Sequence, residues 1–301
     1  MTVIKVGTSS WADRTLLRSG WYPREANTPA GRLGYYADRF PLVEVDTSYY
    51  AVPAPETTQG WVDATGADFT FNVKAYRLFT GHPTPVATLP ADLRPARGPD
   101  QIRRRDLPPT AYDELWRRFR AALAPIAAAD RLGAVLLQFP PWLARGEAAR
   151  RRIAELADRC RPWRVAVELR HASWFDGRAA LETLAFLREH ELTNCCVDMP
   201  QGHPDSVPPI LIATADLAMV RMHGHSTAWD GGDKEDRFRY AYGDTELRNW
   251  SQLLTELAGQ ADELHVLFNN CCAGQAQRDA ERLAELLAGR VPAGAERSSR
   301  R

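Results

Sequence analysis

Ionisable residues crowd the end of one apolar segment of the sequence. The segment VAVELRHASWF, residues 165–175, has the alternation of a buried strand until Glu168, Arg170 and His171 arrive together. Ionisable side chains at the end of a buried strand need solvent, an ion partner or a ligand. An acid, a guanidinium and an imidazole together can bind an anion and transfer a proton. The segment therefore predicts one part of a site whose other residues come from elsewhere in the chain.

The elements that would position such a site form a regular alternation. Short apolar runs rich in β-branched residues predict strands, and amphipathic stretches between them predict helices. The strands are predicted at 3–8, 42–47, 69–74, 133–139, 164–170, 192–198, 217–223 and 263–269. The helices are predicted at 29–40, 55–65, 109–128, 147–160, 177–190, 244–258 and 274–288. This α/β alternation over 301 residues predicts a TIM-type (β/α)8 barrel, with an open doubly wound sheet as the second option.

Two connections break the alternation. Residues 199–216, between the sixth and seventh predicted strands, contain four prolines and no convincing helix, so this connection is expected to be irregular. Residues 75–108 form a long connection rich in proline and charge. We expect one domain over residues 1–290 and a frayed tail at 291–301.

Polar side chains gather where the predicted strands end. Alternate residues of a barrel strand point inward, and the last ones lie at the C-terminal mouth, where barrel enzymes carry their chemistry. The residues expected to point inward are Glu44, Asp46, Asn72, Lys74, Gln138, Glu168, Arg170, Asn194, Cys196, Asp198, Arg221, His223 and one of Asn269 and Asn270. Such a mixed ring could be a self-satisfied ion-pair network. Buried ion pairs stabilise a fold poorly compared with apolar filling, so the pattern favours function.

Composition excludes several classes of protein. The formal net charge is zero, so no overall field attracts nucleic acid or an anionic membrane, and any cationic site must be local. The sequence has no apolar run of membrane-spanning length and no apolar signal core, so we expect a cytoplasmic protein without a membrane partner. No GxGxxG follows the first strand, so a dinucleotide site is unsupported. A cytoplasmic protein is expected to keep its cysteines as reduced thiols, here Cys160, Cys195, Cys196, Cys271 and Cys272. A thiolate metal site is disfavoured, because the adjacent pairs lack CxxC ligand spacing.

The strand ends also resemble a known family. The segments that carry the resemblance are VGTSSW (6–11), FPLVEVDTSYYAVP (40–53), FTFNVKAYR (69–77), GAVLLQFPPWL (133–143), VAVELRHASWF (165–175), VDMP (197–200), VRMHGH (220–225) and FNN (268–270). In this order they resemble the YecE-like proteins, known as domain of unknown function 72. The resemblance implies a TIM-barrel-like fold and a polar mouth, without an established reaction. The family is distantly similar in fold to endonuclease IV, a metal-dependent phosphodiesterase. This chain departs from the family pattern at Cys271 and Cys272 and in the length of the connection after Lys74.

The first functional hypothesis is an enzyme that acts on a phosphorylated or otherwise anionic substrate. A nucleic-acid phosphodiester is one such substrate, and the enzyme would then be a hydrolase or phosphodiesterase. Acid–base roles are predicted for Glu168, Glu44, His223 and Asp198. Substrate contacts are predicted for Lys74, Arg170, Arg221, His171, Gln138, Asn269, Asn270, Trp11, Tyr49 and Trp174. The sequence requires no cofactor and assigns no metal ligands, although one divalent metal on Glu44, Glu168, Asp198 or His223 stays open.

Two alternatives belong to other classes. A glycosidase-like or sugar-binding barrel would use Glu44 and Glu168 as paired carboxylates and stack sugars on Trp11, Trp174 and Trp229. A non-catalytic module for a small anion or nucleic acid would stack its ligand on the same aromatic side chains beside the cations. His223 and His225 are two residues apart and could share a metal if the strand continued. The loop 224–243 carries glycines beside Trp229, as expected of a mobile lid.

Overall fold

Eight parallel strands close into a barrel. The structure is a computed structural model that describes residues 2–203, 205–229, 231 and 234–289. The strands are β1 (Val3–Thr8), β2 (Leu42–Val45), β3 (Thr70–Lys74), β6 (Leu132–Gln138), β7 (Val165–Glu168), β8 (Thr193–Asp198), β9 (Leu217–Met222) and β10 (Glu263–Phe268). They pair in chain order, and β1 closes the ring between β10 and β2. The predicted TIM-type barrel is confirmed.

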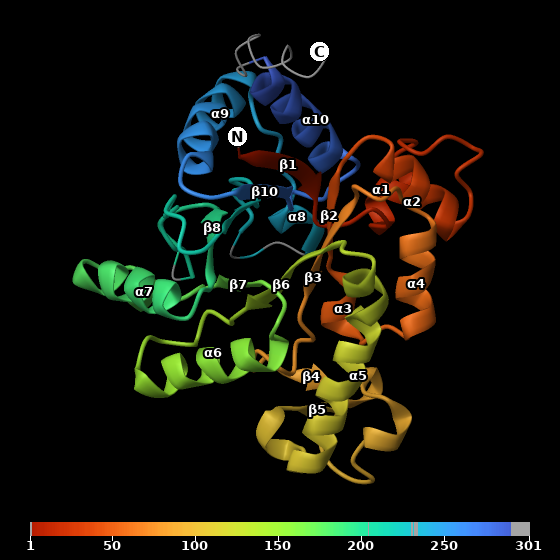
Figure 1. Ribbon diagram of the computed structural model, residues 1–301, viewed down its shortest axis with the longest axis vertical. Helices are drawn as coiled ribbons and strands as arrows, with labels where there is room; N and C mark the ends of the chain where they lie inside the picture. The colour runs from red at the N-terminus through yellow and green to blue at the C-terminus, as the bar shows by residue number, and fades with distance from the viewer. Residues whose placement is uncertain (1, 204, 230, 232–233, 290–301) are drawn as a thin grey trace, which may run out of the picture.

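Helices surround the barrel, as Figure 1 shows. The seven predicted helices are present as α2 (Pro29–Ala37), α4 (Pro55–Asp63), α5 (Pro109–Ala128), α6 (Glu147–Cys160), α7 (Arg178–Glu189), α9 (Asp244–Ala258) and α10 (Gln275–Ala288). Three short helices join them: α1 (Arg14–Arg18), α3 (Thr47–Tyr50) and α8 (Lys234–Arg237). Proline opens α2, α4 and α5, where its fixed φ and missing N–H cost nothing. In Figure 1, α6 and α7 lie on one side of the barrel and α2 and α4 on the other.

The long connection 75–108 is packed structure. It contains a small antiparallel pair, β4 (Thr84–Pro85) and β5 (Gln101–Ile102), and three 3₁₀ turns. Phe79 stacks on Trp116 of α5 with ring centroids 3.9 Å apart. The guanidinium of Arg94 donates to the carbonyls of Leu89 and Ala87 at 2.9 and 2.8 Å. The Arg94 side chain therefore satisfies backbone carbonyls of its own loop.

The irregular connection between the sixth and seventh barrel strands is also confirmed. The described residues of 199–216, which join β8 to β9, contain no helix. Backbone carbonyls cover the outside of β8 where a helix would otherwise pack. The amide of Asn194 donates to the carbonyls of Ile210 and Ile212 at 3.0 and 3.4 Å. Thr214 Oγ1 accepts from the Asn194 backbone N–H at 2.8 Å.

The predicted facing of β8 is wrong for this reason. Asn194, Cys196 and Asp198 were expected inside the barrel, but Asn194 serves the outer connection and Cys196 packs in the outer core. Cys195 instead packs inside, with its Sγ 3.9 Å from Glu168. Polar donors are needed outside a strand that is covered by loop backbone, so the usual polarity of a barrel strand is reversed here.

The barrel interior is layered. An apolar layer fills its middle with Leu42, Ala134, Leu136, Ala166, Cys195, Leu217, Met219 and Leu267. Below it, the buried ring of His265 lies 3.0 Å from the Asn72 amide. Gly133 is required at this level, because a Cβ there would meet Asn72 Oδ1 at 2.5 Å. Above the apolar layer lie three charged side chains with no exposed surface, Glu44, Glu168 and Arg221, which form the floor of the mouth.

The single domain expected over 1–290 stays a prediction, and the tail at 291–301 lies outside the described residues. Within the described residues, no helix is both long and apolar enough to cross a membrane. All five cysteines are free, as expected.

Candidate functional site

A cavity of about 610 Å³ opens at the C-terminal mouth of the barrel. Seven of the eight strands deliver a lining residue at or just beyond their C-terminal ends: Ser9, Asp46, Lys74, Gln138, Arg170, His223 and Asn269. Tyr49 and Tyr50 of α3 form part of one wall, and Arg237 and Phe238 come from the loop 224–243. The cavity therefore lies where the sequence predicted it, and the loop expected to be a lid contributes to its lining.

The floor of the cavity is a buried ion cluster. Arg221 donates through Nη1 to Glu168 Oε2 at 2.5 Å and through Nη2 and Nε to the two Glu44 oxygens at 2.5 and 3.0 Å. None of the three side chains has exposed surface, and none lines the cavity among the described residues. The predicted acid–base residues Glu44 and Glu168, and the predicted substrate contact Arg221, are thus held against one another beneath the site.

Burial and charge oppose each other in this cluster. Burial acts to raise the pKa of Glu168, but the charges of Arg221 and then Arg170 outweigh it and lower the pKa. For Glu44, burial outweighs Arg221 and the pKa is raised. Burial acts to lower the pKa of Arg221, and the charges of Glu168 and Glu44 raise it. Glu168 is consequently an ionised anchor for two guanidinium groups and not a free base.

Two further cations lie above the floor. Arg170 Nε lies 3.2 Å from Glu168 Oε1, and Lys74 Nζ lies 3.3 Å from Asp46 Oδ1. Lys74 Nζ also lies 4.7 Å from the ring centroid of Tyr49, within cation–π distance. Glu44, Asp46 and Glu168 thus balance Lys74, Arg170 and Arg221, and the floor is close to neutral. Any preference for an anion must come from groups added to this balanced set.

His223 offers one such group. Its Nδ1 lies 2.8 Å from the Asn269 amide nitrogen, so Nδ1 accepts and the proton of the neutral ring resides on Nε2. The pKa of His223 is well below its ordinary value, first through burial and then through Arg170 and the neighbouring cations. Nε2 is buried and finds no partner among the described residues. His223 is therefore placed to donate a hydrogen bond at neutral pH, and not to act as a base.

Unpartnered polar atoms concentrate at the cavity. Buried Ser9 Oγ, Asp46 Oδ1, His223 Nε2 and Arg237 Nε make no hydrogen bond to the described part of the chain, and all four residues line the cavity. Glu168 Oε1, just beneath, also makes no hydrogen bond, but it is ion-paired with Arg170, as Asp46 Oδ1 is with Lys74. Each of the other three atoms costs about 1–3 kcal/mol if nothing pairs with it. Their gathering in one cavity is typical of a site that a ligand completes.

Several predicted contacts lie elsewhere. Trp174 is fully buried and donates from Nε1 to the Leu143 carbonyl at 2.8 Å. Trp11 packs edge-to-face on Trp61 with centroids 5.5 Å apart. His171 Nδ1 accepts from the Ser173 backbone N–H at 3.1 Å and caps a 3₁₀ turn. None of the three lines the mouth cavity among the described residues, because each completes local structure instead.

Asn270 is also outside the mouth cavity. Its amide donates to Asp279 Oδ2 at 2.7 Å and to the Tyr240 carbonyl at 2.8 Å. Of the adjacent asparagines, only Asn269 lines the described cavity, because successive residues at the end of β10 point to opposite sides.

Asp198 lies on the outer side of β8, away from the floor. Its Oδ2 accepts from Tyr242 Oη at 2.6 Å, and its Oδ1 lies 2.8 Å from His225 Nε2. With Glu246, these residues bring ligand atoms within 4.8 Å of one another, the one such group that could hold a metal ion among the described residues. The hydrogen bond between Asp198 and His225, and the ion pair between His225 Nδ1 and Glu246 Oε1 at 3.4 Å, already account for that arrangement. The carboxylate of Asp198 raises the pKa of His225 by accepting its hydrogen bond.

The geometry does not bring together a metal site from the predicted residues. Glu44 and Glu168 are bound to Arg221, His223 Nδ1 is bound to Asn269, and Asp198 is outside. Nor do His223 and His225 share a face. Gly224, between them, has φ +79°, which ends the strand, and a Cβ at this position would meet Tyr240 Cβ at 2.5 Å.

Sequence reasoning missed Ser9, Arg237 and Phe238 as lining residues. Ser9 directly follows the first strand and could have been found by extending the inward alternation by one residue. Arg237 and Phe238 lie in a loop whose path over the mouth no periodicity encodes. Tyr49, Lys74, Gln138 and Arg170 were predicted and do line the cavity.

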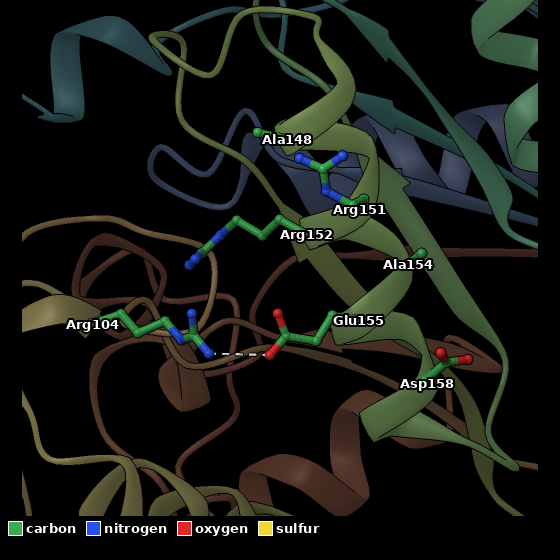
Figure 2. A pocket seen from close by; sticks show the side chains of 7 residues that line it. All are labelled: Arg104, Ala148, Arg151, Arg152, Ala154, Glu155 and Asp158. Atoms are coloured by element: carbon green, nitrogen blue, oxygen red, sulfur yellow. Dashed lines mark hydrogen bonds and ion pairs between the residues drawn. The ribbon is translucent and has the colours of Figure 1, made fainter.

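A second, larger depression lies on the outside of the barrel (Figure 2). Its volume is about 740 Å³, and its described lining includes Arg104, Arg151, Arg152 and Glu155 and shares no residue with the mouth cavity. Arg104 pairs with Glu155 at 3.1 Å, Arg151 with Glu147 at 3.0 Å, and Arg152 donates to the Phe79 carbonyl at 2.7 Å. These arginines are engaged by the protein itself. A substitution such as Arg151→Gln should therefore leave the mouth cavity unchanged.

Known proteins resemble this chain over nearly its whole length. The family described as "Protein of unknown function DUF72" matches residues 5–300. The UPF0759 protein YunF of Bacillus subtilis (strain 168) is 31% identical over 295 residues, covering 95% of each chain. A DUF72 family protein of Thermotoga maritima MSB8 is 28% identical with a TM-score of 0.77, covering 95% of this chain and 99% of that one. A DUF72 family protein of Enterococcus faecalis V583 is 24% identical with a TM-score of 0.77, covering 95% and 96%. The chain therefore belongs to the DUF72 family, as its resemblance to the YecE-like proteins predicted.

Proposed function

We propose that this protein is an enzyme that acts on a phosphorylated or otherwise anionic substrate in the mouth cavity, with a nucleic-acid phosphodiester as one such substrate. The observation that carries the proposal is that three buried polar atoms without a hydrogen bond to the described chain, Ser9 Oγ, His223 Nε2 and Arg237 Nε, belong to residues that line one cavity with Lys74 and Arg170. A guanidinium and an imidazole N–H with free donors suit the oxygens of a phosphate group. The cytoplasmic location expected from the sequence stays a prediction.

The proposed roles depend on which side chains line the cavity and can contact a substrate. Lys74, Arg170, Gln138 and Asn269 line the cavity and would contact the substrate. Arg221, Glu44 and Glu168 would hold the strand ends in place from below, as positioning residues. Asp46 lines the cavity with one oxygen held by Lys74 and is our candidate for the general base. His223 would donate a hydrogen bond to the developing negative charge.

The sugar hypothesis loses its acid–base pair in this geometry. Glu44 and Glu168 grip the same guanidinium and have no exposed surface, so neither can reach a glycosidic oxygen. The non-catalytic binding module shares the cavity and its donors with the proposal, and turnover distinguishes the two.

The test is turnover of a substrate panel. We would incubate the protein, with and without added divalent ions, with p-nitrophenyl phosphate, bis(p-nitrophenyl) phosphate and mononucleotides. Nitrophenol or phosphate release would be measured for the wild type, Asp46→Asn and the matched control Arg151→Gln. We expect turnover in the wild type and control, and a loss of roughly 100-fold or more in Asp46→Asn. Saturable binding without turnover would support the binding module, and neither binding nor turnover would refute the proposal.

A further inference from the structure

Two guanidinium groups converge on one buried tryptophan at the mouth. Trp229 is 1% exposed, donates from Nε1 to Asp205 Oδ1 at 3.1 Å and packs with Val197, Met199 and Val207. The Arg237 guanidinium carbon lies 4.9 Å from its ring centroid and that of Arg170 lies 5.9 Å away. The two arginines reach this point from different segments, the residues directly after β7 and the loop 224–243.

Both arginines have N–H groups that are weakly bonded or not hydrogen-bonded to the described chain. Arg170 directs Nε toward Glu168, and within the described residues the one hydrogen bond from its Nη1 goes to the thioether sulfur of Met199, at 3.3 Å. A thioether is a weak acceptor that an oxyanion can replace. Arg237 Nε is buried and makes no hydrogen bond to the described chain, and Asp205, its ion-pair partner, lies 3.9 Å from Nη2. This distance is too long for a hydrogen bond.

His223 completes the set. Its ring centroid lies 6.3 Å from that of Trp229 and 5.9 Å from that of Phe238. The unpartnered Nε2 belongs to a side chain only 1% exposed. Arg170, Lys74 and Arg237 all act electrostatically on this imidazole, so the cations surround it. An anion that accepted a hydrogen bond from Nε2 would be attracted by these cations.

We infer that Arg170, Arg237 and His223 Nε2 form a subsite for a phosphate-type oxyanion, and that the loop 224–243 completes it by supplying Arg237. This inference rests on the proposed function and deepens it, because it names the group recognised and the residues that recognise it. The floor below is close to neutral, so Arg237 is the cation that the loop adds to it, with Asp205 Oδ2 3.9 Å from its Nη2 and Glu235 also lining the cavity. A tetrahedral oxyanion presents acceptors in several directions, which suits three donors from three elements better than a planar carboxylate does.

A hydrogen bond within the loop lies next to Arg237. Ser226 Oγ donates to the Asp236 carbonyl at 2.7 Å and joins the two arms of the loop. Arg237 is the last residue of the short helix α8, next to this contact. The position of Arg237 over the mouth thus depends on this contact, and an oxyanion bound to Arg237 would also hold the end of α8 against the barrel.

Calorimetric titration with inorganic phosphate tests the inference. The proteins are the wild type, Arg237→Gln, His223→Gln and the control Arg151→Gln, each checked for fold by circular dichroism. Arg237 lies on the half-exposed loop surface, so its substitution leaves the barrel intact. We expect phosphate to bind the wild type, the Kd to rise about 10- to 100-fold in Arg237→Gln, and the control to stay within about twofold. Acetate should bind far more weakly than phosphate.

The possible results distinguish failure of the oxyanion subsite from failure of the proposed function. Phosphate binding to the wild type that Arg237→Gln leaves unchanged would overturn this subsite while leaving the proposed function in place. Equal affinity for acetate and phosphate would overturn the assignment to a phosphate-type group. Failure of the wild type to bind phosphate or any phosphorylated compound would contradict the proposed function itself.

Discussion

Arg221 illustrates how a single residue can define the floor of the site without touching a ligand. Its guanidinium donates three hydrogen bonds to the carboxylates of Glu44 and Glu168, and none of the three side chains has exposed surface. A buried ion cluster of this kind gives little stability compared with apolar packing, but it is costly to break. Glu44, Glu168 and Arg221 therefore fix the ends of β2, β7 and β9 relative to one another.

Replacement of this arginine tests that role. Arg221→Met leaves two buried carboxylates without their partner, so we expect the free energy of unfolding to fall by about 3–5 kcal/mol. Arg151→Met, on the exterior of α6, should change it by less than about 0.5 kcal/mol. Urea denaturation followed by fluorescence measures both. An Arg221→Met protein as stable as the wild type would show that the cluster does not hold the floor.

His82 carries a pH dependence that can be worked out. It is 8% exposed, its Nδ1 lies 3.0 Å from Thr80 Oγ1, and burial, then Lys74 and Arg77, lower its pKa from 6.5 to about 4. Because the folded-state pKa is below the unfolded value, the stabilising contribution is complete above pH 6.5 and is lost as the pH falls toward 4. The free energy of unfolding lost between pH 6.5 and 4 is at most roughly 3 kcal/mol. His82→Gln should make the free energy of unfolding less steep between pH 6.5 and 4, measured by urea titration at several pH values. An unchanged slope would contradict the account of this residue.

At the scale of elements, the loop 224–243 is anchored at its base by one hydroxyl. Tyr242 Oη accepts from the Gly224 N–H at 2.8 Å and donates to Asp198 Oδ2 at 2.6 Å. Burial, reinforced by Asp198, raises the pKa of Tyr242 well above its ordinary value, so the hydroxyl keeps its proton. The anchor joins the loop to the outer side of β8.

Removal of this hydroxyl should loosen the loop. Tyr242→Phe leaves a buried N–H and a buried carboxylate oxygen without a partner, at a cost of about 1–3 kcal/mol. We expect amide hydrogen exchange in 224–229 to accelerate roughly 5- to 150-fold, as measured by mass spectrometry. Tyr76→Phe, which removes a hydroxyl bonded to Thr88, is the matched control and should leave exchange in this segment unchanged. Equal exchange in Tyr242→Phe and the wild type would show that the anchor lies elsewhere.

For the whole molecule, closure of the barrel depends on a narrow contact. Strands β1 and β2 pair over only two residue pairs, Gly7 with Leu42 and Thr8 with Val43. A Cβ at Gly7 would lie 2.0 Å from the Leu42 carbonyl oxygen, which is too close for any side chain. Glycine is thus needed where the ring closes.

A pair of glycine substitutions tests this closure. Gly7→Ala should lower the free energy of unfolding by more than about 4 kcal/mol or prevent folding, because backbone would have to move. Gly60→Ala, in α4, meets no described atom within 4 Å and should raise stability by roughly 0.5–1 kcal/mol through helix propensity. Thermal unfolding of both variants provides the measurement. A stable, native-like Gly7→Ala protein would mean that the closure tolerates a wider gap.

The sequence predicted the barrel and part of the lining of the mouth cavity because strands such as β7 alternate clearly between apolar and polar residues. Val165 and Val167 face the helices while Glu168 and Arg170 face the axis. The run TNCCVD of β8 has no such alternation, and its facing depends on the loop carbonyls that cover it. Arg237 could not be predicted, because its position depends on how a loop folds over the mouth. Trp11 and Trp174 were predicted as binding residues from their type, but tertiary packing places both in the core.

The most direct test of the central claim is to locate an anion in a crystal. Selenate is a tetrahedral oxyanion with an anomalous signal, and crystals would be soaked with it at low millimolar concentration in a medium free of sulfate and phosphate. We expect an anomalous peak in the mouth cavity, within hydrogen-bond distance of His223 Nε2 and the guanidinium groups of Arg170 and Arg237. Peaks confined to exterior arginines such as Arg151, with the mouth empty, would contradict it.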